Sequence, residues 1–241
     1  MTDELFREDA TLRECSAAVI ALAEGGVILD RTVFYPQGGG QAGDAGTLLL
    51  AGGARITVAD TRKSKESPGA VLHLLTPDAD LSLLAPGTAV SAQIDWHRRH
   101  RHMRFHTGTH LLCALVPHPV DGCSITADYA RLDFHMAEPL DKDALTAGIA
   151  RLVAQGSAVR QRWIAEAVLD ANPGLVRSMS VQPPRSGTGL GRIRIIDIEG
   201  IDLQPCGGTH VANTAEIGAV IVTKIEKKSA LTRRVVLGFA P

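Results

Sequence analysis

Residues 106–110 of the chain read His-Thr-Gly-Thr-His, and residues 206–210 read Cys-Gly-Gly-Thr-His. Each run places two residues of metal-binding type four positions apart. Because residues i and i+4 lie on the same face of a helix, His106 and His110 can direct their imidazoles at a common point. The first run therefore predicts a helix that carries half of a metal site.

The second run supplies the other half through a turn, since Gly207 and Gly208 favour a tight bend that brings Cys206 and His210 together. One thiolate and three imidazoles suit zinc far better than magnesium or calcium, which prefer oxygen ligands. Iron and nickel also bind these residue types, so the ligand set does not exclude them. Four protein ligands are typical of structural zinc, whereas catalytic zinc keeps an exchangeable position, and the spacing does not decide between the two.

Outward from the first run, apolar residues at helical spacing predict a helix over residues 103–116. Asp141 can cap a second helix, whose apolar residues recur at positions 145, 149, 152 and 153. Helices on one side of a mainly antiparallel sheet make an α+β domain, which we expect over residues 91–241. The strands predicted there are 125–134, 159–163, 192–198, 217–226 and 234–239.

Residues 1–90 read as β-structure, because short apolar runs are separated by glycine or proline. We expect a small β-barrel-like domain that contains a glycine-rich segment at residues 38–40. Its boundary is expected near residue 90. The strands predicted there are 16–21, 27–34, 46–50, 54–59 and 70–75, with a further run at 89–94.

Longer stretches around these runs resemble a known family. Residues 199–211 (EGIDLQPCGGTHV) resemble the second zinc motif of the alanyl-tRNA editing domain, and residues 106–112 (HTGTHLL) resemble the first. Residues 34–46 (FYPQGGGQAGDAG) are similar to the glycine-rich segment that precedes this domain in alanyl-tRNA synthetases and free-standing AlaX proteins, and residues 131–134 (RLDF) also match. The matches fall in order and cover positions 30 to 240.

Length favours the free-standing form. A synthetase needs an aminoacylation domain, for which 241 residues leave no room, and no GxxxxGK[ST] phosphate loop is present. The resemblance is to AlaX proteins of medium length, and implies zinc-dependent deacylation in trans of tRNA(Ala) mischarged with serine or, in some members, glycine. A pocket built for alanine cannot strongly reject a smaller substrate or one that adds a hydroxyl, so a second site must hydrolyse the error.

The resemblance also implies roles for single residues. It assigns one zinc ion to His106, His110, Cys206 and His210. Thr109 is a candidate catalytic residue that would bind the serine hydroxyl, although a helical threonine can instead bond its own helix. Gln204 and Asp202 are candidates for holding water or the substrate ammonium, or for stabilising the turn.

Candidate substrate-binding residues are Gly38, Gly39, Gly40 and Arg104. The three glycines can also be read as a mobile turn, because they lack a fixed phosphate-binding pattern. Gly108 stands where family members often carry alanine, which loosens the helix.

The formal net charge is −1, but it is unevenly spread. Residues 1–95 hold 7 Lys and Arg against 13 Asp and Glu, and residues 96–241 hold 18 against 13. Basic clusters of this kind can be solvated surface charge or can neutralise RNA phosphates. They comprise Arg98, Arg99, Arg101 and Arg104, and later Lys224, Lys227, Lys228, Arg233 and Arg234.

The composition, 45% hydrophobic and 21% charged, is typical of a soluble globular protein. No apolar run reaches the roughly 18 to 20 residues of a membrane span, and residues 1–14 form no signal peptide, so we expect a cytoplasmic location without a membrane partner. Four scattered cysteines do not read as a disulfide framework.

Two other functions remain open on the residues alone. A zinc-dependent hydrolase of a small molecule would act without RNA. A structural zinc protein that only binds RNA would hold tRNA without deacylating it, and would unfold on loss of a ligand.

Overall fold

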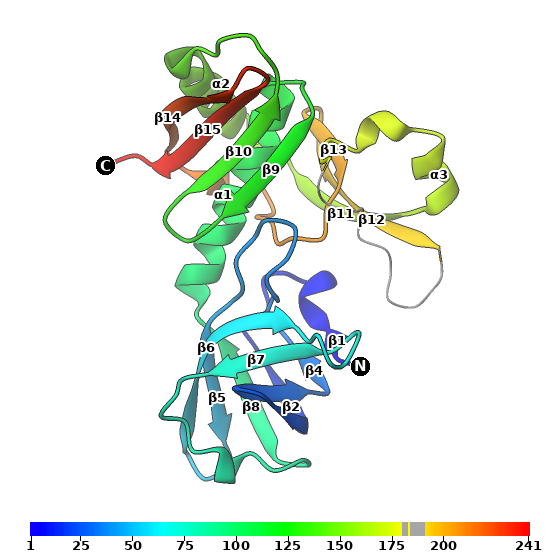
Figure 1. The fold of residues 1–241 in the computed structure, drawn as a ribbon, viewed down its shortest axis with the longest axis vertical. Coiled ribbons are helices and arrows are strands. Elements are labelled where there is room, and N and C mark those ends of the chain that lie inside the picture. Colours follow the sequence, from blue (N-terminus) through cyan, green and yellow to red (C-terminus); the bar gives the residue numbers. More distant parts are fainter. Residues whose placement is uncertain (180–182, 184–190) are drawn as a thin grey trace. The chain divides into compact units, whose positions relative to one another are not determined.

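The computed structural model describes residues 1–179, 183 and 191–241 (Figure 1). These residues form two compact units. The first comprises Met1–Gly38 and Ala42–His100, and the second comprises Gly39–Gln41 and Arg101–Pro241. Among the described residues, no helix is both long and apolar enough to cross a membrane.

The first unit is a closed barrel in which the strands follow the order β2-β3-β7-β6-β5-β8. Adjacent barrel strands are antiparallel. The barrel strands are β2 (Glu14–Ala23), β3 (Gly26–Leu29), β5 (Gly46–Leu50), β6 (Arg55–Lys63), β7 (Val71–Leu75) and β8 (Ala89–Ile94). Outside the barrel, β1 (Asp3–Glu4) pairs with β4 (Arg31–Thr32), and two 3-10 helices are η1 (Leu5–Arg7) and η2 (Leu81–Leu83).

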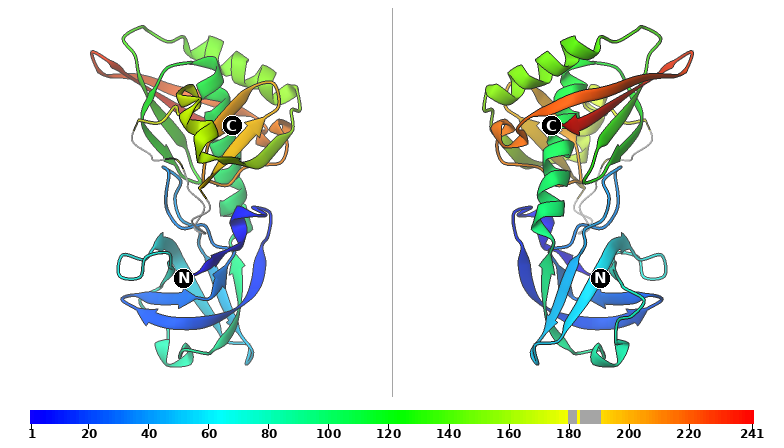
Figure 2. Two further views of the ribbon diagram at one scale, coloured as in Figure 1. Left: turned by 90° about the vertical axis from the view of Figure 1, so that its right-hand side faces the viewer. Right: turned by 90° about the vertical axis from the view of Figure 1, so that its left-hand side faces the viewer.

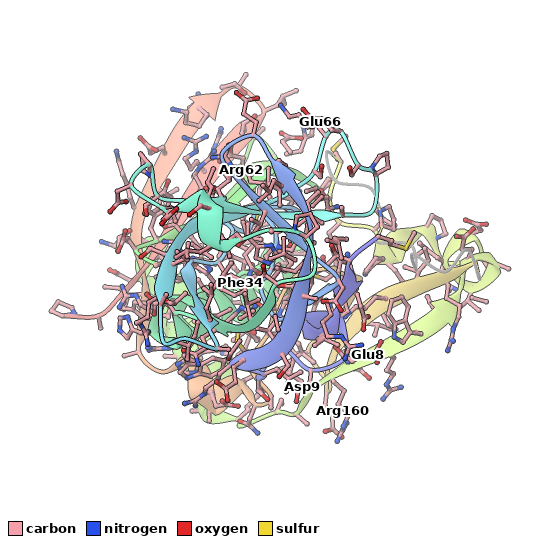
Figure 3. The ribbon with its side chains drawn as sticks, turned by 90° about the horizontal axis from the view of Figure 1, so that it is seen from below. Glu8, Asp9, Phe34, Arg62, Glu66 and Arg160 are labelled. Atoms are coloured by element: carbon pink, nitrogen blue, oxygen red, sulfur yellow. The ribbon has the colours of Figure 1, made fainter. Side chains whose placement is uncertain are left out.

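Alternate strand residues fill the barrel, as expected where successive side chains point to opposite faces. Its buried cluster includes Val27, Leu29, Leu48 and Val58. Phe34 is also fully buried and lies at the centre of the barrel in Figure 3, whereas Glu66 points outward. This apolar interior stabilises the first unit.

The predicted strand over residues 27–34 is wrong as a single element. Strand β3 ends at Leu29, and the chain turns at Asp30. The Asp30 carboxylate accepts hydrogen bonds from the backbone N–H groups of Ala18 and Arg31, both at 2.8 Å. An aspartate that bonds nearby backbone in this way favours a turn over a continuing strand.

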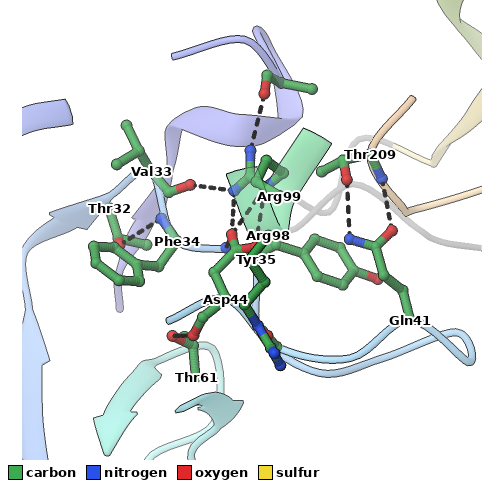
Figure 4. A network of polar contacts seen from close by, with 12 residues as sticks. Thr32, Val33, Phe34, Tyr35, Gln41, Asp44, Thr61, Arg98, Arg99 and Thr209 are labelled. Carbon is green, nitrogen blue, oxygen red and sulfur yellow. Dashed lines mark hydrogen bonds and ion pairs between the residues drawn. The ribbon is translucent and has the colours of Figure 1, made fainter. Parts of the chain in front are cut away.

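A buried ion pair in the first unit joins Arg99 to Asp44, and neither side chain is exposed (Figure 4). The Arg99 guanidinium also donates to the carbonyls of Val33 and Ala10, at 2.6 and 2.9 Å. The Asp44 carboxylate accepts the backbone N–H of Tyr35 at 2.7 Å. The reading of Arg99 as a phosphate contact is therefore wrong, because its side chain is enclosed by the barrel unit.

The second unit contains two antiparallel sheets, ordered β14-β15-β10-β9 and β11-β12-β13. The first sheet consists of β9 (Val120–Ile125), β10 (Ala130–His135), β14 (Val220–Ser229) and β15 (Thr232–Phe239), and the second of β11 (Val159–Ala165), β12 (Arg192–Ile198) and β13 (Asp202–Pro205). The helices are α1 (Trp96–Leu115), which starts in the first unit, α2 (Lys142–Ala154), α3 (Glu166–Asp170), η3 (Pro173–Leu175) and η4 (Thr214–Ile217).

Helix α2 packs along β14 (Figure 2). Val222 of β14 donates its backbone N–H to Thr146 Oγ1 of α2 at 3.1 Å. Asp141 caps this helix, as predicted, by accepting the N–H groups of Asp143 and Ala144. The chain thus has an α+β fold with an N-terminal barrel, which confirms the predicted fold class.

Two other predicted strands need correction. Residues 125–134 form the end of β9 and most of β10, with a turn between them in which Thr126 Oγ1 accepts the N–H groups of Asp128 and Tyr129. The strand expected to begin at residue 217 begins at Val220, because Ile217 closes η4 and Gly218 follows with a φ of 66°.

Helix α1 begins at Trp96, seven residues before the predicted start. Asp95 Oδ1 accepts the N–H of Arg98 at 3.0 Å, and Asp95 O accepts the N–H of Arg99. Asp95 is thus the N-cap, and the apolar stripe starts only in the third turn of the helix.

Candidate metal centre

Two elements distant in sequence bring four metal-type ligands together. His106 and His110 lie one turn apart on α1, while Cys206 and His210 lie in the loop that follows β13. One ligand atom from each residue lies within 4.8 Å of the others. Cys206 Sγ is 3.4 Å from His106 Nε2 and 3.3 Å from His210 Nε2.

Gly208 allows the loop to approach the helix closely. A Cβ at this position would lie 2.1 Å from His106 Cε1 and 2.4 Å from His106 Nδ1, far inside contact distance. The backbone N–H of Gly208 also points to Cys206 Sγ at 3.4 Å. Only glycine fits here, so the predicted tight turn has a steric reason as well as a conformational one.

The ring of His106 is oriented by Gln41, from the glycine-rich segment. Gln41 Oε1 accepts the backbone N–H of Thr209 at 3.1 Å and lies 2.7 Å from His106 Nδ1. A backbone N–H can only donate, so this oxygen is the acceptor for His106 as well. His106 therefore carries its proton on Nδ1, and the Nε2 lone pair faces Cys206.

The other two imidazoles have the same arrangement. His110 Nδ1 lies 2.8 Å from Asp202 Oδ2, a carboxylate that accepts. His210 Nδ1 lies 3.2 Å from Thr107 Oγ1, whose own proton is donated to the Met103 carbonyl. Both rings are therefore protonated on Nδ1. Outer hydrogen bonds that leave the inner nitrogens free are typical of histidine metal ligands, so the residues fit a zinc ion.

The charges around Cys206 also suit a metal ligand. Burial raises the pKa of its thiol, but the charges of His106 and His210 and nearby hydrogen bonds lower it to well below the usual range. Burial lowers the pKa of His110, while Asp202 and Cys206 raise it, to about 10 on balance. Since a metal needs a thiolate and a free imidazole nitrogen, metal binding would displace a proton from His110.

Two neighbouring cysteines behave differently. Burial, as the largest cause, raises the pKa of both Cys113 and Cys123 to about 12. These thiols therefore stay protonated at neutral pH, and Cys206 alone of the three has the thiolate that a metal ion prefers.

Comparison with known proteins shows the family of the chain. Residues 193–236 match the protein family described as "Threonyl and Alanyl tRNA synthetase second additional domain". Residues 7–98 match the family described as "tRNA synthetases class II (A)". The alanyl-tRNA editing protein AlaX-M of Saccharolobus solfataricus is 32% identical over 248 residues, which cover 98% of each chain. This chain belongs to the family of AlaX-M alanyl-tRNA editing proteins.

Two further relatives support the assignment of this chain to the AlaX-M family. The AlaX-M protein of Methanosarcina barkeri is 35% identical over 97% of each chain. The alanine–tRNA ligase of Pyrococcus furiosus is 34% identical over 94% of this chain but only 24% of its own length. The similarity to the ligase thus concerns one part of a much longer protein.

Asp202 and Gln204 occupy alternate positions on β13, so both side chains face inward. Gln204 Nε2 lies 2.9 and 2.8 Å from the two oxygens of Asp202, and Asp202 in turn bonds His110. Both side chains are less than a tenth exposed. In this AlaX-M family member, the two predicted residues therefore form a chain of hydrogen bonds behind a ligand.

Thr109 lies on α1 between the two histidine ligands and is buried. Its Oγ1 donates to the carbonyl of His106 at 2.7 Å. The hydroxyl proton is thus used within the helix, and the oxygen keeps lone pairs that can accept a hydrogen bond.

The predicted substrate-binding residues are spread over several places. Gly38 belongs to the first unit, where its carbonyl accepts the hydroxyl of Tyr35. Gly39 and Gly40 have positive φ, and the Gly40 carbonyl accepts the N–H of Ile125 at 2.8 Å. Arg104 donates to the Ile217 carbonyl, and its guanidinium lies 4.0 Å from the Phe239 ring centroid.

Several members of the basic clusters have structural partners. Arg101 donates to the carbonyl of Ala127 and lies over Phe239, and Arg98 donates to the carbonyl of Gly43. Arg233 is buried and donates to the Ala137 carbonyl, while Arg234 pairs with Asp133. In the second cluster Lys224, Lys227 and Lys228 are exposed, and Lys224 pairs with Glu226 at 2.8 Å.

The sequence analysis gave no role to Gln41, Thr107, Thr209 or Arg194. The first three complete the hydrogen bonds described above. Arg194, on β12, is buried and donates to the carbonyls of Cys206 and Gly208 at 2.8 and 3.0 Å, which holds the ligand loop. Their only sequence signal is position. Gln41 directly follows the three glycines, and the two threonines, Thr107 and Thr209, lie inside the runs 106–110 and 206–210.

Proposed function

We propose that this chain is a hydrolase that deacylates mischarged tRNA(Ala) in trans, with serine-charged tRNA(Ala) as its main substrate and glycine-charged tRNA(Ala) as a second. The observation that carries the proposal is the cluster of three imidazoles and one thiolate with every outer imidazole nitrogen hydrogen-bonded. Support comes from relatives named alanyl-tRNA editing proteins, which match nearly the full chain.

We propose zinc as the metal and His106, His110, Cys206 and His210 as its ligands. The mixed nitrogen and sulfur donor set supports zinc over magnesium or calcium. When bound, the ion would supply positive charge that polarises the substrate carbonyl or orients and activates water.

The reaction joins water to the ester between the amino acid and the terminal ribose. Water attacks the carbonyl carbon, the bond to the ribose oxygen breaks, and that oxygen takes up a proton. Thr109 is proposed to accept a hydrogen bond from the serine hydroxyl, which alanine lacks. A site that uses such a bond discriminates more strongly than one based on size.

Asp202 and Gln204 are proposed to act through His110. The carboxylate holds the ring with Nε2 free, and the amide holds the carboxylate. This pattern of outer partners commonly sets the geometry and basicity of a metal ligand.

The proposed partner is tRNA, which places the activity in the cytoplasm, where tRNA is charged. Gly38, Gly39, Gly40 and Arg104 are proposed to contact the substrate, and exposed Lys224, Lys227 and Lys228 are suited to phosphates. Residues 1–90 are proposed as the glycine-motif domain, and residues 91–241 as the editing domain.

The direct test is deacylation of serine-charged and alanine-charged tRNA(Ala) by the wild type, Cys206→Ala and Cys15→Ala. Cys15 lies on β2 of the barrel and controls for the chemical change alone. We expect the wild type and Cys15→Ala to release serine and spare alanine, and Cys206→Ala to release neither.

Two outcomes would reject the proposal in different ways. If the folded wild type binds tRNA(Ala) without releasing serine, the chain is a non-catalytic RNA-binding protein. If it hydrolyses small aminoacyl esters as fast as charged tRNA, it is a small-molecule hydrolase.

A further inference from the structure

Gln41 is the residue through which the glycine-rich segment meets both ligand runs. Its side chain is fully buried, although it lies 65 residues from His106 and 168 residues from Thr209. Burying an amide is costly unless its polar atoms are bonded, so a buried glutamine with well-placed partners indicates a defined task.

The hydrogen bonds of the Gln41 amide join it to His106, a proposed ligand, and to Thr209, the residue before another. Its Nε2 donates to Thr209 Oγ1 at 2.9 Å, and its Oε1 accepts from Thr209 N (Figure 4). The same Oε1 also accepts from His106 Nδ1 at 2.7 Å. The backbone N–H of Thr209 fixes the amide orientation. The same amide therefore bonds a ring on α1 and the residue preceding His210.

Contacts within the second unit hold the backbone around Gln41. The carbonyl of Gly40 accepts the N–H of Ile125, and Gln41 forms an isolated bridge with that residue. A Cβ at Gly40 would lie 2.8 Å from Cys123 Sγ, so the segment packs closely against β9. The amide is thus placed by a fixed backbone rather than by a free side chain.

We propose that Gln41 is a positioning residue of the metal site. It holds His106 with the proton on Nδ1 and Nε2 directed at the other ligands, and it ties the loop of Cys206 and His210 to helix α1. This inference rests on the proposed metal site, but it assigns to the glycine-rich segment a role in metal binding that is separate from substrate contact.

The test compares metal binding by the wild type with Gln41→Leu, Gln41→Glu and Gln37→Leu. Leucine removes the acceptor, glutamate keeps an acceptor for His106 and Thr209, and Gln37 is an exposed glutamine in the same segment. Zinc affinity is measured by competition with a chromogenic chelator. Cobalt substitution then reports ligand geometry through its visible absorption bands.

We expect Gln41→Leu to weaken zinc binding by about 10- to 100-fold and to alter the cobalt spectrum, as outer partners of metal ligands generally do. Gln41→Glu and Gln37→Leu should remain close to wild type. The thermal unfolding of each variant without added metal shows whether it folds. If Gln41→Leu does not fold, Gln41→Asn, which withdraws the amide by one methylene, should show the same loss.

Two results would overturn the inference. One is wild-type affinity and an unchanged cobalt spectrum in Gln41→Leu, and the other is an equal loss in Gln41→Glu and Gln41→Leu. A wild type that binds neither zinc nor cobalt would reject the metal site itself, and is recognised from the wild-type measurement alone.

Discussion

His106, His110 and His210 carry the same ring but have three different outer partners: an amide oxygen, a carboxylate and a hydroxyl. Burial lowers the pKa of His110, but Asp202 and Cys206 raise it, to about 10 on balance. By contrast, burial is the largest cause that lowers the pKa of His210 to about 3. His110 and His210 are both buried, and the charged partner Asp202 contributes to the opposite shift of the His110 pKa.

Asp202→Asn should weaken zinc binding by about 10- to 100-fold, because the amide keeps the shape of the partner but loses its charge. The measurement is zinc competition with a chelator. Asp197→Asn is the matched control, since Asp197 lies on neighbouring strand β12 and pairs with exposed Arg162 of β11. Equal zinc affinity in Asp202→Asn and the wild type would show that the carboxylate does not act on His110.

His73, in the barrel, should make stability depend on pH. Burial lowers the pKa of His73 from 6.5 to about 4, and hydrogen bonds to the backbone of Val27 and Val71 offset only part of this shift. The unfolded chain therefore takes up a proton first as pH falls. The contribution of His73 is present above pH 6.5 and is lost as pH falls towards 4.

The expected loss is about 2 kcal/mol between pH 7 and pH 5. Urea unfolding of the wild type and His73→Gln at both pH values measures it, and the variant should lack this part of the pH dependence. Identical pH dependence in the two proteins would contradict the assignment.

The pairing of His106 with His110 and of Cys206 with His210 could be predicted from sequence at this scale, because a spacing of four within each run is a local property. The outer partners could not. Gln41 is separated from His106 by 65 residues, and only the folded chain brings the two together. Thr107 lies inside the predicted helix, but its bond to His210 spans 103 residues.

At the scale of elements, α1 and the loop after β13 each carry a glycine, Gly108 and Gly208, and the two differ in whether a side chain would fit. A Cβ at Gly108 would lie 3.8 Å from Leu237 Cδ1 and 3.9 Å from Ile217 Cγ2, which are ordinary contacts. A Cβ at Gly208 would overlap His106. One glycine is therefore replaceable, and the other is required by the close approach of the loop.

Gly108→Ala should stabilise the protein by about 1 kcal/mol, because alanine is the better helix former and no neighbour must move. Gly208→Ala should abolish tight zinc binding. Urea unfolding and zinc competition on both variants test this contrast. Lower stability in Gly108→Ala, or wild-type zinc affinity in Gly208→Ala, would contradict the geometry.

Element type was easier to predict than element limits. Residues 46–50 and 89–94 were predicted as strands and form β5 and β8 with those bounds. The early start of α1 was missed because, after Trp96, its first two turns consist of histidines and arginines, which carry no apolar stripe. The turn at residues 126–129 was missed because it depends on the Thr126 hydroxyl, which an apolar pattern does not register.

At the scale of the whole molecule, the family resemblance extends over both units, and the comparisons cover nearly the full chain. The distribution of charge along the sequence predicted less about the structure than the family resemblance did. The −6 and +5 halves suggested an RNA surface, but Arg99 and Arg233 are buried, and Arg98, Arg101, Arg104 and Arg234 bond backbone or an acid. A charge count cannot separate structural arginines from those available to a phosphate.

The central claim is that editing takes place at the four-ligand metal site. The most direct measurement is the release of serine from serine-charged tRNA(Ala) by metal-stripped protein during titration with zinc. We predict that stripping abolishes release, and that activity returns in proportion to zinc and saturates at one ion per chain. Full activity in stripped, folded protein would contradict the claim.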